Sequence, residues 1–263
     1  MKKLKFLSVL LIFIMFSSIF VGCTPSDPEV SGGSNTGQID PPLIVASTSW
    51  TAAIAEAAGA TDVVTLAPVE LRHPPEYDFK PSDIQKVQDA DWIIFGGYEP
   101  FMNKIIEAND IPQDKIIRIS TTNTFDNLNE QTQLIAEYLG TDMIQEAWLN
   151  QFSIELEMIQ EKAIEQNIKD TKVLVHTHMA AFAESLGYEI AAVFSADDLS
   201  PARIGELATM DHDLIIDNYH NPQGEAIQAL SEQERVVLRN FPGPEHEGIA
   251  DLFVDNAKKL GLY

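Results

Sequence analysis

The stretch LIVASTSWTAAIAEAAGATDVVTL (residues 43–66) carries the pattern that decides the fold. Residues 43–47 form a short apolar run that predicts a buried strand. Residues 50–58 predict a helix that Gly59 closes, and residues 63–66 predict a second strand. Apolar runs that alternate with helices are typical of parallel strands covered by helices on both faces. The stretch therefore predicts an α/β fold.

The same alternation continues up to residue 140. The sequence predicts further elements at residues 81–88 (helix), 92–95 (strand, ended by Gly96-Gly97), 116–119 (strand) and 130–139 (helix, stopped by Gly140). From Thr141 to about Ile168 there is no Gly or Pro, and apolar residues recur at spacings of three and four. This second pattern predicts one helix of about 27 residues and about 40 Å.

After the long helix the alternation of strands and helices resumes. The expected strands are residues 172–175, 189–194, 214–216 and 235–238, and the expected helices are residues 180–186, 200–208, 224–230 and 249–260. We therefore expect two α/β lobes with parallel sheets, residues 43–140 and 171–263, joined by a linking helix at residues 141–170.

The N-terminal segment is typical of an export signal. Lys2, Lys3 and Lys5 precede an apolar run from Phe6 to Val21, which is shorter than the ~20 residues of a bilayer span. Cys23, the one cysteine of the chain, follows this run. We expect residues 1–22 to be a signal peptide and Cys23 to be lipidated, for example with palmitate. Residues 24–42 are rich in Pro, Gly and Ser and predict a flexible tether to the outer face of a membrane.

The charge balance is strongly acidic. The chain has 17 Lys and Arg against 40 Asp and Glu, a formal net charge of −23. Without residues 1–22, which hold three of the lysines and no acidic residue, the balance is 14 against 40, or −26. Such a surface argues against nucleic-acid binding and attracts cations, although simple solubility explains it equally well.

Five of the six histidines follow predicted strands: His73, His176, His178, His220 and His246. Ligand sites in open α/β folds lie at this edge, beyond the carboxyl ends of the strands. Neutral imidazole is a good zinc ligand, and carboxylates extend the range toward manganese. A lone loop histidine is more often a surface residue than a ligand. His212 lies between Asp211 and Asp213 on the opposite edge, and we expect its side chain to be solvated.

Several stretches resemble the zinc/manganese solute-binding lipoproteins of metal ABC transporters. The resemblance is carried by LRHPPEYDFKPSDIQKVQDADWIIFGGYEPFMNKI (residues 71–105), VLVHTHMAAFAESLGYEIAAV (173–193), SPARIGEL (200–207) and LIIDNYHNPQGEAIQAL (214–230). It implies two lobes joined by one long helix, and a monomer that binds a divalent transition metal for an ABC permease. Zinc, or another such metal, would then be the transported ligand rather than a cofactor.

The resemblance assigns metal ligands position by position. His73 matches the first family ligand, and His176 matches the ligand of the second lobe, with His178 as the near alternative. The family's His-x-Trp-x-Asp-Pro stretch is replaced by STTNTFDNLNEQ (residues 120–131), which has no histidine. Its late acidic ligand has no match in residues 237–241. We therefore expect a ligand set in which His178, His220 or His246, with Asp217, Glu245 or Glu247 as further donors, joins His73 and His176 in place of the lost groups.

The same departure allows a different solute. One alternative is a binding lipoprotein for a metal chelate such as cobalamin or a siderophore, in which Trp50, Tyr98, Phe125 and Tyr219 line a wider cleft. A metal-dependent hydrolase built on His176, His178 and Asp217 is a further alternative. The sequence has no His-Glu-x-x-His, Gly-x-Ser-x-Gly or phosphate-loop pattern, so we expect no enzyme. A surface adhesin is a fourth alternative, and no pattern in the sequence distinguishes it from these functions.

Overall fold

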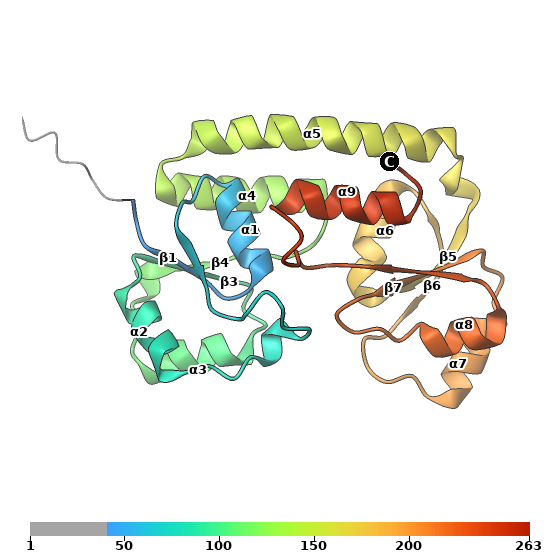
Figure 1. The fold of residues 1–263 in the computed structure, drawn as a ribbon, viewed down its shortest axis with the longest axis horizontal. Helices are drawn as coiled ribbons and strands as arrows, with labels where there is room; N and C mark the ends of the chain where they lie inside the picture. The colour runs from blue at the N-terminus through green and yellow to red at the C-terminus, as the bar shows by residue number, and fades with distance from the viewer. Residues whose placement is uncertain (1–40) are drawn as a thin grey trace, which may run out of the picture. The chain divides into compact units, whose positions relative to one another are not determined.

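The computed structural model describes residues 41–263 (Figure 1). The predicted signal peptide, Cys23 and nearly all of the predicted tether lie outside these residues. The first lobe holds a parallel sheet in the order β2-β1-β3-β4. Its strands are β1 (Ile44–Ala46), β2 (Val63–Thr65), β3 (Trp92–Phe95) and β4 (Ile116–Arg118). Its helices are α1 (Ser49–Ala57), α2 (Pro81–Asp89), α3 (Pro100–Ala108) and α4 (Phe125–Leu139), with short 3-10 turns η1 (Pro74–Glu76) and η2 (Gln113–Lys115).

The second lobe repeats this topology. Its four strands are all parallel and follow the order β6-β5-β7-β8. They are β5 (Lys172–His176), β6 (Glu189–Phe194), β7 (Leu214–Asn218) and β8 (Glu234–Leu238). The remaining elements are η3 (Ile168–Asp170), η4 (Thr177–Met179), α6 (Ala180–Leu186), α7 (Pro201–Ala208), α8 (Glu225–Ser231) and α9 (Ile249–Lys259).

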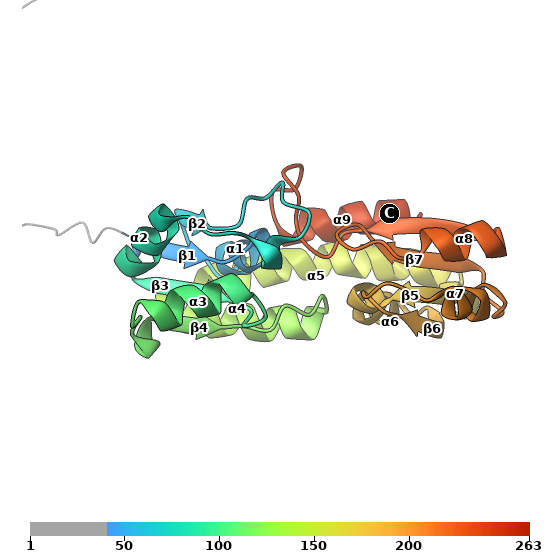
Figure 2. The same cartoon turned by 90° about the horizontal axis from the view of Figure 1, so that it is seen from below.

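Helix α5 (Asp142–Glu165) links the two lobes. Its 24 residues give a length of about 36 Å. It lies against α4 of the first lobe and against α6 and α9 of the second (Figures 1 and 2). Phe152 on α5 stacks on Trp148 and meets Phe253 of α9 edge-on, each at 5.1 Å between ring centroids. One hydrophobic cluster therefore runs through α5 and both lobes.

The predicted fold class is confirmed, and two of the first lobe's helices differ from expectation. Helix α4 begins at Phe125, five residues before the predicted start, because the Thr124 side chain caps it by accepting a hydrogen bond from Asn127 N. Helix α3 is absent from the predicted elements. It has Pro100 at its start and buries Phe101, Met102, Ile105 and Ile106.

No helix among residues 41–263 is both long enough and apolar enough to span a bilayer.

Candidate functional site

A cavity of 330 Å³ lies where loops of the two lobes meet. The first lobe contributes residues from α1, η1 and the loops after β3 and β4, and the second contributes residues from η4, α6 and the loop after β8. The lining residues are Trp50, Pro75, Tyr98, Thr121, Thr122, Asn123, Thr177, His178, Ala181, Asn240 and Phe241. Most of these residues follow strands, so the cavity lies at the edge that the sequence predicts for a ligand site.

The first lobe supplies two aromatic side chains whose positions are fixed locally. Trp50 is buried, and its indole Nε1 donates a hydrogen bond to the Thr121 carbonyl at 2.9 Å. The Tyr98 ring lies directly over Gly96, where an added Cβ would come within 2.2 Å of a ring carbon. Glycine at position 96 therefore lets Tyr98 lie against the backbone. Burial raises the pKa of the Tyr98 phenol, and the charge of Glu99 raises it further, so the hydroxyl stays protonated.

Behind Tyr98 lies a fully buried carboxylate, Glu99. Its Oε1 accepts hydrogen bonds from Ser47 Oγ at 2.6 Å and from Gly96 N at 3.0 Å. Its Oε2 has no hydrogen-bond partner within the described part of the chain. Glu99 does not line the cavity, so its role in the site is to hold the loop after β3.

The second lobe brings His176 and His178 together, with ring centroids 5.1 Å apart. His176 ends β5 and is fully buried, and its Nδ1 accepts a hydrogen bond from His178 N at 3.1 Å. An accepting Nδ1 places the proton of the neutral ring on Nε2. Burial lowers the pKa of His176 to about 4, and a charge on His178 would lower it further. His176 is therefore neutral near pH 7 and caps the turn that carries His178.

His178 is the histidine that lines the cavity. It is exposed enough to meet a ligand, and partial burial lowers its pKa below the ordinary value of 6.5. A neutral imidazole offers a nitrogen lone pair to a metal ion, whereas the protonated ring offers none. His178 is therefore in its metal-binding form near pH 7.

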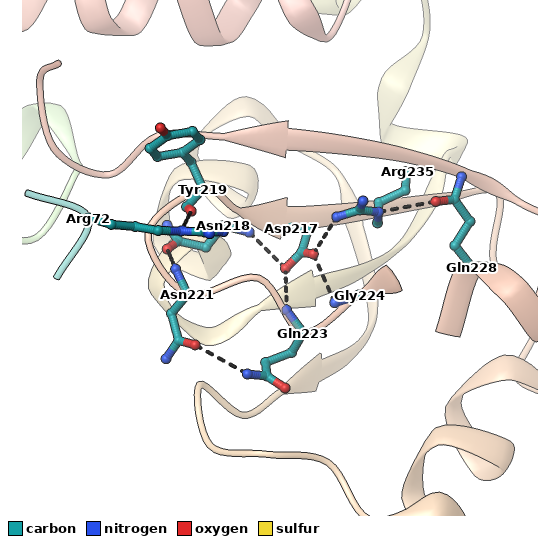
Figure 3. A network of polar contacts seen from close by, with 9 residues as sticks. All are labelled: Arg72, Asp217, Asn218, Tyr219, Asn221, Gln223, Gly224, Gln228 and Arg235. Atoms are coloured by element: carbon teal, nitrogen blue, oxygen red, sulfur yellow. Dashed lines mark hydrogen bonds and ion pairs between the residues drawn. The ribbon is translucent and has the colours of Figure 1, made fainter. Parts of the chain in front are cut away.

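Asp217 is fully engaged inside the second lobe (Figure 3). Its Oδ1 accepts hydrogen bonds from Asn218 N at 2.8 Å and Gln223 N at 3.1 Å. Its Oδ2 accepts from Gly224 N at 2.8 Å and pairs with the Arg235 guanidinium at 2.9 Å. With four donors on its two oxygens, this carboxylate holds the loop after β7 rather than facing the cavity.

His220 and the loop that carries His73 form a contact between the lobes. His220 is buried, with Nδ1 3.0 Å from the Arg72 carbonyl, and Arg72 Nε donates to the Tyr219 carbonyl at 3.2 Å. Burial is the main cause that lowers the pKa of His220 to about 4. His73 itself is exposed and does not line the cavity, whereas Pro75, two residues later, does.

His246 lies in a separate cavity of 140 Å³ beside Ser49 and Pro242. Its Nδ1 accepts a hydrogen bond from Gly243 N at 2.9 Å, and its Nε2 lies 3.4 Å from Asp255 Oδ2. These contacts hold the loop that returns from β8 to the first lobe, where Ser49 Oγ donates to the Pro242 carbonyl. The expectation that His212 is solvated is wrong, because its ring is buried with Nδ1 2.9 Å from the Met210 carbonyl.

The structure thus pairs His176 with His178, places Asp217, His220 and His246 in other contacts, and leaves the His73 side chain exposed outside the cavity. Within residues 41–263, no group of three or more His, Cys, Asp or Glu is arranged to share a metal ion. The ligand roles of these side chains stay predictions.

A larger cavity of 530 Å³ lies between α4, α5 and α6. Carboxylates line it, and its lining has no imidazole; its residues are Thr124, Phe125, Asp126, Ser153, Leu156, Glu157, Gln160, Ala181, Glu184 and Ser185. We assign the site to the smaller cavity, because that cavity joins strand-following loops of both lobes and contains His178.

Of the four aromatic residues expected to line a wider cleft, Trp50 and Tyr98 line the smaller cavity. Phe125 lines the larger one, and the Tyr219 ring lies under Arg239, whose guanidinium carbon is 3.7 Å from the ring centroid. Sequence reasoning missed the contribution of Asn240 and Phe241. Their position after a predicted strand is the signal that could have identified them.

Residues 44–134 match the family model described as zinc-uptake complex component A, periplasmic (ZnuA). The predicted family resemblance is therefore confirmed. The match covers the first lobe from β1 to most of α4. No curated protein sequence matches this chain.

Three solved structures share the fold of this chain. A cadmium-bound periplasmic metal-binding protein from Candidatus Liberibacter asiaticus is 14% identical, with a TM-score of 0.64 over 84% of this chain and 100% of that one. FpvC from Pseudomonas aeruginosa in complex with Mn2+ is 16% identical, with a TM-score of 0.64 over 84% and 98% of the two chains. ZnuA is 18% identical, with a TM-score of 0.62 over 85% and 99%. At these identities the likeness establishes the fold of both lobes.

Proposed function

We propose that this protein is an extracytoplasmic solute-binding lipoprotein that captures a divalent transition metal and presents it to an ABC permease. The fold, the family match of the first lobe and the position of His178 support this function. The lipid anchor at Cys23 follows from the sequence pattern of residues 1–23. No chemical transformation is part of the proposal.

The observation that carries the proposal is the His178 imidazole in the cavity between the lobes. Its lowered pKa keeps it neutral, and the hydrogen bond to the His176 ring fixes the turn on which it lies. Imidazole suits zinc better than manganese, which prefers oxygen donors. Zinc is therefore the first metal to test, and manganese the second.

The experiment is metal analysis of the full-length chain, purified in detergent and dialysed against zinc. We expect the wild type to retain zinc near pH 7.5 and the His178→Ala variant to lose at least about 90% of it, a tenfold effect or more. His212→Asn is the matched control, because His212 precedes β7 and lies at the opposite edge of the sheet. Equal zinc in wild type and His178→Ala would remove His178 from the site.

The pH dependence of zinc retention is a second readout of the same assay. Because burial lowers the pKa of His178, its ring stays neutral below the ordinary value of 6.5. We therefore expect zinc to be retained at about pH 6.5 and released progressively as the pH falls further, since protons compete for the imidazole. Retention that does not change over this range would argue against a histidine ligand.

The cavity also bears on the chelate alternative. A volume of 330 Å³ is at the lower end of the range for small-molecule sites, roughly 300–1,000 Å³. It does not favour a ligand as large as cobalamin, with its corrin ring and nucleotide loop. Metal without a large organic carrier is thus the form that this cavity supports.

A further inference from the structure

The lining of the cavity between the lobes is almost free of charge. It contains one imidazole, His178, and neither a carboxylate nor a Lys or Arg side chain among the described residues. Its other polar members are three threonines and two asparagines, which present neutral hydroxyl and amide groups. Trp50, Tyr98 and Phe241 supply aromatic surface. The cavity is thus a neutral, partly aromatic surface in a chain whose formal net charge is −23.

This lining does not complete the donor set that a tightly bound bare divalent cation needs, so zinc alone should bind only through His178 and more weakly than a suitable complex. Zinc sites in proteins have at least three protein ligands, almost always from His, Cys, Asp or Glu. Of these residue types the cavity offers only His178. Two buried carboxylates, Glu99 and Asp217, do not line the cavity. Asp217 pairs with Arg235, and Glu99 accepts hydrogen bonds from Ser47 and Gly96 on one of its two oxygens.

Desolvation gives a second reason against a bare ion. An uncompensated charge that leaves water for a neutral cavity loses much of its hydration energy, whereas a neutral complex does not. The cavity volume of 330 Å³ also exceeds the space that one ion occupies and is in the range of small organic ligands. Charge and volume therefore both favour an uncharged complex of modest size.

We propose that the metal binds as a neutral complex with a small amino-acid-type chelator, in which His178 completes the coordination sphere. Two deprotonated amino acids balance the charge of a divalent ion, and their amino and carboxylate groups supply the donors that the cavity lacks. The aromatic side chains then contact the organic part, and the threonine and asparagine groups hydrogen-bond to its carboxylates. This inference rests on the proposed function, because it concerns the form in which the same metal arrives.

The test compares zinc alone with zinc plus L-histidine, using equilibrium dialysis of the full-length chain in detergent with radiolabelled histidine. A protein that binds bare zinc competes with histidine, so its apparent affinity must fall when histidine is added. A protein that binds the complex must instead gain affinity. We expect a gain of at least about tenfold, with zinc and histidine retained together.

Two other outcomes overturn the inference and can be told apart. If zinc binds alone and histidine weakens it, the chelate inference is wrong and the proposed metal receptor stands. If neither zinc nor its histidine complex is retained, the proposed function fails, and the inference fails with it.

A cavity-filling variant locates the complex. Thr122 lines the cavity and is exposed. Among the described residues, its hydroxyl has one hydrogen-bond partner, Ser120 Oγ at 3.3 Å, and either oxygen can donate. We expect Thr122→Trp to abolish the gain that histidine produces, because the indole occupies the space of the chelator. Thr122→Ser keeps the hydroxyl without filling the cavity and should preserve the gain. A gain that survives in Thr122→Trp would place the complex elsewhere and overturn the assignment.

Discussion

The two lobes have the same sheet topology and differ in the loops that follow their strands. In the first lobe, the loop after β3 carries the buried carboxylate of Glu99, which within residues 41–263 has two donors on one oxygen and none on the other. In the second lobe, the equivalent strand β7 carries Asp217 near its end, and the two oxygens of Asp217 share four donors, among them Gln223 N and Gly224 N of the following loop. The first lobe gives the cavity aromatic and hydroxyl groups, and the second gives it an imidazole.

This difference shows that the repeated scaffold fixes where a site lies but not its chemistry. Parallel strands in the order 2-1-3-4 bring the same loops to one edge in each lobe. Which groups then face the cavity depends on local hydrogen bonds, such as the one that turns His178 outward and His176 inward. Each lobe can therefore be tested separately by changing the buried groups that hold its loops.

The largest difference should appear between the two buried carboxylates. Asp217→Asn puts an amide group against Arg235 and the backbone N–H donors, so we expect it to lower the free energy of unfolding by about 3–5 kcal/mol. Glu99→Gln keeps one oxygen for Ser47 and Gly96 and replaces only the unpartnered oxygen, so we expect a loss of about 1 kcal/mol. Urea unfolding of both variants measures this difference. Equal losses in the free energy of unfolding would show that Asp217 and Glu99 stabilise the loops after β7 and β3 to the same extent.

The pH dependence of stability should arise mainly in the second lobe. Burial lowers the pKa of His176 and of His220 from 6.5 to about 4 in the folded chain. Between these values the unfolded chain binds protons that the folded chain does not, so stability falls as the pH falls. Each histidine should contribute a loss of roughly 3 kcal/mol across this window.

Urea unfolding of wild type and His176→Gln near pH 7 and near pH 4.5 tests this expectation. The variant lacks one of these two histidines, so its loss on acidification should be smaller by about 2–3 kcal/mol. The quantity compared is the change in the free energy of unfolding between the two pH values. A constant loss of stability caused by the substitution itself cancels from this difference. Identical slopes would show that His176 does not titrate in this range.

The smallest effect should come from the contact that joins the lobes at Arg72. Its guanidinium donates to the Tyr219 carbonyl at 3.2 Å from an exposed position. Arg72→Ala should lower the free energy of unfolding by about 0.5–1 kcal/mol, while the contact between the His220 ring and the carbonyl of residue 72 persists. Arg203→Ala, which removes an exposed ion pair to Glu206 within α7, is the control and should change stability by less than about 0.5 kcal/mol. If Arg72→Ala and Arg203→Ala lowered the free energy of unfolding equally, the Arg72 contact between the lobes would not stabilise the fold.

Much of the scaffold was predictable because its signals are local. All eight strands have apolar runs, and Gly140 and Gly187 end α4 and α6 in the left-handed region with φ of 67° and 98°. Helix α3 was missed, although Pro100 and a following apolar stripe mark it. His178 was identified as a candidate from its position after β5, and the structure places it in the cavity.

The orientation of the other histidines was not predictable, because distant groups decide it. His220 points to the Arg72 carbonyl, 148 residues away in the sequence, and His246 lies against Asp255 on α9. A histidine after a strand carries the same sequence signal whether its ring faces a cavity or a carbonyl. Spacing alone could therefore not separate the lining residue His178 from the residues that hold loops.

The order of strands and helices, the long linking helix and the edge at which a site forms were set by the amino-acid sequence, since apolar periodicity and chain direction act over short distances. The composition of the cavity was decided by tertiary structure. Trp50, Tyr98, His178 and Phe241 come from four separate segments, and packing between the lobes brings them together. Burial and hydrogen bonding in that packed state then fix which rings are neutral and which face a ligand.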